Sequence, residues 1–141
     1  MWWRNKKFKN IDEFYLLNTD LLLLKKTENE DEKNKNLEKA ANILKNGIKL
    51  ISESYKLYIK LSDILYQIKQ YNQARAILDK GIAIKKNENC ALLYKEQILL
   101  ENKLGNKNVA KNLLYKALKK FKDSKDQNIF QEIEKELNEN I

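Results

Sequence analysis

Apolar residues recur along most of this chain at the three- and four-residue spacing of an amphipathic helix. One such series is Tyr58, Leu61, Ile64, Leu65 and Ile68. The same spacing, interrupted by short polar stretches, predicts about seven helices and no strand. Their expected ranges are 12–26, 37–51, 54–70, 72–86, 90–104, 108–122 and 126–140. The chain is therefore predicted to be all-α.

Two neighbouring segments depart from the amphipathic pattern. Between Glu13 and Leu24 most side chains are apolar, so we expect the first helix to be covered on more than one side. The run from Glu28 to Asn36 holds only charged residues and asparagine. A stretch of that composition predicts an exposed acidic loop over residues 27–36, irregular and mobile.

A frame of small residues is repeated three times. The copies are Ala40-Ala-Asn-Ile-Leu-Lys-Asn-Gly47, Ala74-Arg-Ala-Ile-Leu-Asp-Lys-Gly81 and Ala110-Lys-Asn-Leu-Leu-Tyr-Lys-Ala117, offset by 34 and 36 residues. An aromatic residue stands 16 positions before the second and third copies. Periods of this size indicate an α-α superhelix, a solenoid of antiparallel helical hairpins.

The frame divides residues 1–141 into one solenoid segment of about three repeats with partial ends. The repeats cover approximately residues 12–51, 54–86 and 90–122, and a terminal helix follows at 126–140. Small residues seven apart share one helix face, where they let a facing helix approach closely. The residues expected to pack the repeats are Ala40, Gly47, Tyr58, Ala74, Gly81, Tyr94, Ala110 and Ala117.

Composition favours a binding protein over an enzyme. The chain has no histidine, which excludes histidine-based triads, and it has no glycine-rich phosphate loop. We expect no catalytic residue, no cofactor and no metal, and we expect the single Cys90 to be a half-buried structural thiol. No apolar run is long enough to span a membrane, and the first residues lack the pattern of a secretion signal.

The formal charge of +8 raises the question of nucleic acid binding. Only two of the 28 basic residues are arginine, Arg4 and Arg75. Arginine is the residue that forked contacts and stacking on nucleic acids require. A solvated lysine coat is therefore favoured over a specific RNA surface, although bases concentrate at 4–9 and 119–125.

Three features of the chain resemble tetratricopeptide repeats (TPR). They are the aromatic residue before the frame, the two small positions within the frame and the period of 34 residues. Ala74-Arg75 and Leu100-Glu101 are more similar to the half-a-TPR (HAT) variant of RNA-processing factors. Gly105-Asn-Lys-Asn-Val-Ala-Lys111 is the most specific piece of the resemblance to HAT arrays of pre-mRNA splicing factors. The resemblance implies a scaffold that bridges spliceosomal snRNP components in the nucleus.

Two other functions stay open. One is an RNA-contacting module that uses the lysine coat. The other is a TPR adaptor of the co-chaperone type, whose carboxylate clamp would need several cationic or amide side chains in one groove. By TPR geometry the possible partner groove would contain Leu16, Asp20, Leu23, Ile59, Asp63, Tyr66, Lys95, Leu99 and Asn102. That mixed set suits an apolar helix or extended segment better than a carboxylate.

The two ends of the predicted solenoid carry apolar residues. Phe130, Ile133 and Leu137 are placed like the first helix of a repeat that lacks its second helix. Trp2, Trp3 and Phe8 precede the first helix. We expect an isolated fragment to cover such ends by self-association or by folding its terminal helix back.

Overall fold

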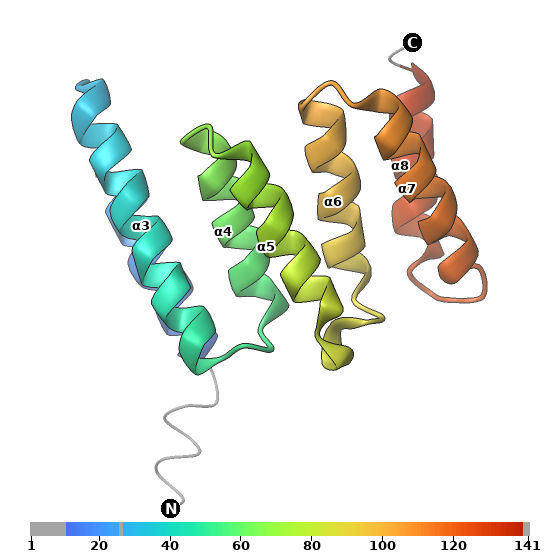
Figure 1. The fold of residues 1–141 in the computed structure, drawn as a ribbon, viewed down its shortest axis with the longest axis horizontal. Helices are drawn as coiled ribbons and strands as arrows, with labels where there is room; N and C mark the ends of the chain where they lie inside the picture. The colour runs from blue at the N-terminus through green and yellow to red at the C-terminus, as the bar shows by residue number, and fades with distance from the viewer. Residues whose placement is uncertain (1–10, 26, 140–141) are drawn as a thin grey trace, which may run out of the picture. The chain divides into compact units, whose positions relative to one another are not determined.

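A computed structural model describes residues 11–25 and 27–139 of the chain. These residues form seven α-helices and one short 3-10 helix, with no strand among them (Figure 1). The α-helices are α2 (Ile11–Leu23), α3 (Glu30–Leu50), α4 (Tyr55–Gln67), α5 (Tyr71–Ala83), α6 (Ala91–Lys103), α7 (Lys107–Lys120) and α8 (Gln127–Glu139), and the 3-10 helix is η1 (Lys85–Asn87). The predicted all-α fold of consecutive antiparallel helix pairs is confirmed: α2 pairs with α3, α4 with α5, and α6 with α7.

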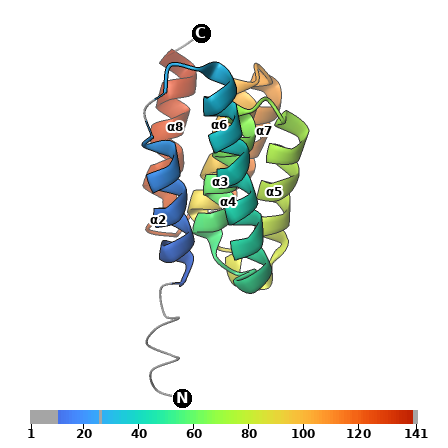
Figure 2. The ribbon, with the colours of Figure 1, turned by 90° about the vertical axis from the view of Figure 1, so that its left-hand side faces the viewer.

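The chain divides into two compact units, residues 1–81 and 82–141. In the first unit, α2 packs against both α3 and α4 (Figure 2). The ring of Tyr15 on α2 lies against Gly47 on α3, and the ring of Tyr58 on α4 lies against Gly81 on α5. Glycine lets the ring approach this closely, because an added Cβ would lie 2.9 Å from Cγ of the tyrosine and one of the two groups would have to move.

In the second unit, α6, α7 and α8 surround one apolar core. Its buried members are Ala91, Ile98, Ala110, Leu114, Ala117, Phe121, Phe130 and Ile133. Phe121 stacks on Phe130 at a ring-centroid distance of 5.1 Å and meets Tyr94 edge-on at 5.7 Å. The terminal helix thus packs back onto α6 and α7, and its remaining exposed residues are mostly polar.

A 36-residue period is visible in the helix boundaries. Helices α4, α6 and α8 begin at residues 55, 91 and 127, and α5 and α7 begin at 71 and 107. The turn after α4 and the turn after α6 also match. Lys69 and Gly105 both adopt positive φ, +65° and +83° respectively, and the amide of the next residue donates to a carbonyl five residues earlier. This is a Schellman-type C-cap, for which glycine is favoured.

The predicted acidic loop over residues 27–36 is wrong for residues 30–36, which form the start of α3. The Asn29 side chain caps that helix by accepting from the amides of Asp31 (2.9 Å) and Glu32 (3.4 Å). Three acids in the first turn interact favourably with the helix dipole. Tyr15 precedes Ala40 by 25 residues, nine more than the 16 that separate Tyr58 from Ala74. These extra residues mainly lengthen a helix, because Ala40 is the eleventh residue of α3 whereas Ala74 is the fourth of α5.

Candidate functional site

The eight residues expected to pack the repeats lie inside the two units rather than on a binding surface. Ala40, Ala74 and Ala110 are fully buried. Gly47, Gly81, Tyr58 and Ala117 are also buried, and Tyr94 is half-buried. Ser62, on the α4 face toward α5, donates from its hydroxyl to the carbonyl of Ala74 at 3.3 Å. These residues therefore pack within the hairpins, and other residues form the outer faces of the helices.

The two repeat tyrosines share a contact that sequence reasoning missed. The Tyr58 hydroxyl donates to the carbonyl of Ser52 at 2.7 Å, and the Tyr94 hydroxyl donates to the carbonyl of Glu88 at 3.1 Å. Each bond reaches back six residues to the turn before the helix. Burial raises the pKa of both phenols, and the charges of Glu88 and Cys90 add to the rise of the pKa at Tyr94.

The predicted groove positions of the first unit lie on the neighbouring helices α2 and α4. Leu16 and Leu23 on α2 and Ile59 on α4 are half-buried. Polar bonds join the same two helices. Lys60 Nζ lies 3.0 Å from Asp20 Oδ1, and Lys56 Nζ lies 3.8 Å from Glu13 Oε1.

A third bond between these helices uses the residue at the start of α4. Ser54 stands at the N-cap position of α4, yet its hydroxyl donates to Asp12 Oδ2 at 2.9 Å and makes no capping bond. Both lysines on this part of α4 are paired with acids of α2. The six predicted groove positions on α2 and α4 include no cation, whereas a carboxylate clamp needs several cationic or amide side chains in one groove.

The remaining groove positions have local contacts. Asp63 accepts from the side-chain amide of Gln67 at 3.1 Å, and the Tyr66 ring lies 5.5 Å from that of Tyr71 at the start of α5. In the second unit, Lys95, Leu99 and Asn102 lie on α6 and are half-buried. The structure thus brings six of the nine predicted positions to α2 and α4, with the other three on α6.

A row of exposed apolar side chains on α2 was not predicted. Phe14, Leu17, Leu21 and Leu24 are 62%, 57%, 56% and 73% exposed. The apolar composition of residues 12–26 predicts a helix that is covered on more than one side. In the structure, α3 and α4 cover only the face of α2 that includes the buried Thr19, and these four residues lie on the opposite face. We call these four residues the α2 stripe. Large exposed apolar patches mark interaction surfaces.

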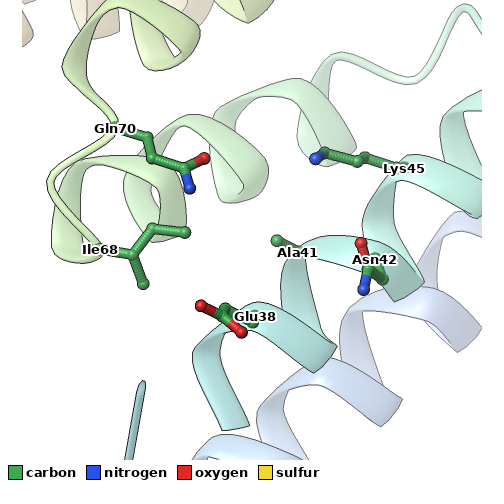
Figure 3. A pocket seen from close by; sticks show the side chains of 6 residues that line it. All are labelled: Glu38, Ala41, Asn42, Lys45, Ile68 and Gln70. Atoms are coloured by element: carbon green, nitrogen blue, oxygen red, sulfur yellow. The ribbon is translucent and has the colours of Figure 1, made fainter. Parts of the chain in front are cut away.

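A shallow hollow lies between α3 and the turn after α4 (Figure 3). Its volume is about 200 Å³. Figure 3 shows side chains of Glu38 and Lys45 on α3 directed toward the same space as that of Gln70. Small-molecule sites are usually larger, about 300–1,000 Å³, and predominantly apolar. The hollow is too small and too polar to resemble such a site.

Two of the lysines in the basic stretch 119–125 lie over aromatic rings. Lys119 Nζ is 4.7 Å from the Tyr115 ring centre, and Lys120 Nζ is 5.7 Å from that of Tyr94. Cys90 is half-buried at the N-terminus of α6. Among residues 11–25 and 27–139, no helix is long and apolar enough to cross a membrane, and no three metal-binding side chains are grouped.

The fold and the packing residues define a class of protein, the α-helical repeat proteins built from antiparallel hairpins. Comparison with known families makes the class more specific, because residues 33–95 match the model of the tetratricopeptide repeat. The matched residues run from α3 into α6. A comparison with curated proteins found no match. Tetratricopeptide repeats generally bind other proteins and are typically non-catalytic.

Proposed function

We propose that this chain is a protein-binding scaffold in pre-mRNA splicing and that it acts in the nucleus on spliceosomal snRNP components. The observation that carries the scaffold function is the tetratricopeptide-repeat segment itself, with its buried frame of small residues and its exposed helix faces. A solenoid of this kind presents extended surfaces to partners.

The splicing role is supported by resemblance. Gln70-Tyr-Asn-Gln-Ala-Arg-Ala-Ile-Leu-Asp-Lys80 and the run from Leu104 to Leu118 are similar to the C-terminal HAT array of pre-mRNA-processing factor six, the bridging scaffold of the tri-snRNP. Gly105 within that run occupies a left-handed turn. HAT arrays occur in several RNA-processing factors, so the resemblance is to the group as well as to that one protein.

Affinity purification of the tagged full-length protein from nuclear extract tests the proposal, with and without nuclease. We expect splicing proteins to be recovered in both conditions. Recovery that depends on RNA would favour the lysine-coat alternative, and recovery of chaperones without splicing proteins would favour the adaptor.

A matched pair of variants connects the result to the groove. Leu16→Asp with Ile59→Asp places charge on the half-buried groove positions of α2 and α4 and should abolish recovery. Leu50→Asp changes an apolar residue on α3 that is 68% exposed, and it should leave recovery unchanged. Equal recovery by all variants would show that partners do not bind through this groove.

A further inference from the structure

The α2 stripe is one continuous helix face. Phe14, Leu17, Leu21 and Leu24 are spaced by three, four and three residues, which places them in a row along the helix. The amide of Leu24 donates to the carbonyl of Asp20 at 2.9 Å, so this residue continues the helical geometry although α2 ends at Leu23. Four large apolar side chains in a row, each more than half exposed, form a patch on the order of several hundred Å².

The charge around the stripe is opposite to that of the chain. Residues 11–32 contain seven acids and two lysines, a net charge of −5, whereas the whole chain is +8. Three of these acids, Asp12, Glu13 and Asp20, lie on α2, where they already contact Ser54, Lys56 and Lys60 respectively. The other acids of this group follow Leu24 at the same end of the α2–α3 hairpin, where Glu28, Glu30, Asp31 and Glu32 are exposed.

This charge distribution discriminates among possible occupants. Two stripes related by a twofold axis would bring the acids of one copy toward those of the other. A stripe packed on the outer face of α8 from a second copy would meet Glu132, Glu134, Glu136 and Glu139. Both arrangements place like charges together, which disfavours them at an interface.

We propose that the α2 stripe binds a basic amphipathic helix of a partner protein. Such a helix places apolar residues at i, i+3 or i+4, and i+7 against the stripe, and lysines or arginines near the exposed acids that follow Leu24. This inference rests on the proposed scaffold function. It concerns a surface other than the groove between α2 and α4, and it adds the chemistry of one partner.

A defined probe tests the interaction with the full chain. The probe is a fluorescein-labelled peptide of about 18 residues, roughly five turns of helix, built from leucine and lysine in an amphipathic pattern. Its matched control has the same leucines with glutamate in place of lysine. Fluorescence anisotropy at two salt concentrations gives the Kd. We expect a Kd on the order of micromolar for the basic peptide, at least tenfold weaker binding of the acidic one, and weaker basic-peptide binding at high salt.

Variants locate the site. Leu17→Ser with Leu21→Ser should weaken binding of the basic peptide at least tenfold, because two apolar contacts are lost. Leu50→Ser removes a leucine of α3 that is also more than half exposed, and it should change the Kd less than twofold. Since these residues are exposed, all three proteins should keep the same helical circular dichroism.

Several results would overturn the proposal. They are equal binding of both peptides, or a Kd that does not respond to Leu17→Ser with Leu21→Ser. A dimer that those substitutions dissociate in sedimentation would assign the stripe to a second copy. Binding that appears only after deletion of residues 1–10, which contain Trp2, Trp3, Phe8 and four basic residues, would assign it to the chain's own N-terminal segment. None of these results bears on the affinity purification, so the two proposals fail separately.

Discussion

Replacement of Gly81 by alanine sets two effects of opposite sign against each other. Alanine is the better helix former by up to about 1 kcal/mol, which would stabilise α5. The new Cβ, however, would lie 2.9, 3.2 and 3.3 Å from Cγ, Cβ and Cδ1 of Tyr58. Contacts below 3.0 Å require one of the two groups to move.

The structure indicates that the clash is the larger effect. The Tyr58 side chain is fully buried, and its hydroxyl is held at 2.7 Å by the Ser52 carbonyl. The ring is therefore fixed at both ends and cannot rotate or slide without breaking a contact. Overpacking of this kind costs about 1–3 kcal/mol. After subtraction of the helix-propensity gain, we expect a net loss of about 1 kcal/mol in the free energy of unfolding.

Chemical denaturation followed by circular dichroism measures the effect. Ala76→Gly, at an exposed position of the same helix, measures the helix-propensity difference alone and should cost up to about 1 kcal/mol. Gly47→Ala should cost less than Gly81→Ala, because its neighbour Tyr15 is only half-buried and can shift. An increase in the denaturation midpoint for Gly81→Ala would refute the reasoning, since it would show that the ring yields freely.

Three further predictions concern other positions. Lys69→Gly should stabilise the chain by about 0.5–1 kcal/mol in denaturation, because a lysine at φ +65° is strained and glycine is not; Gly105→Ala should destabilise by a similar amount. Asn29→Ala should cost about 1 kcal/mol and should increase hydrogen exchange at the amides of residues 30–36, while an unchanged exchange pattern would show that the cap does not hold α3. Burial raises the folded-state pKa of Tyr58 above its unfolded-state pKa of about 10. The part of the free energy of unfolding that depends on the neutral phenol is therefore fully present below about pH 10, and it is lost as the pH rises through the folded-state pKa. Tyr58→Phe should therefore lose stability less steeply above that pH than the unmodified chain in parallel alkaline titrations.

The helices could be predicted because their apolar periodicity is strong. Each described helix from α4 to α8 begins within one residue of the predicted start and ends within three residues of the predicted end. The start of α3 could not be found in this way, because residues 30–36 have no apolar residue and so no periodicity. The signal that was present is local: Asn29 followed by three acids is an N-cap with a first turn suited to the helix dipole.

The candidate surfaces were less predictable than the fold. Sequence spacing identified which residues share a helix face, but it could not show which face the neighbouring helices cover. The apolar run in residues 12–26 was interpreted as a helix covered on more than one side, whereas the α2 stripe remains exposed in the structure. Likewise Asp20 was assigned to a partner groove, and its ion pair with Lys60 depends on the packing of α4 beside α2.

The aromatic position of the repeat shows which part of a tyrosine the fold requires. At three positions 36 residues apart the chain has Tyr58, Tyr94 and Phe130. The first two use a hydroxyl to hold a carbonyl six residues earlier, while Phe130 has no hydroxyl and is nevertheless fully buried, stacked on Phe121. The ring is thus common to all three positions, and the hydroxyl bond is an addition at two of them. Because a net hydrogen bond contributes about 1 kcal/mol whereas loss of a buried aromatic costs about 3–5 kcal/mol, packing of the ring is the main reason for the aromatic at this position.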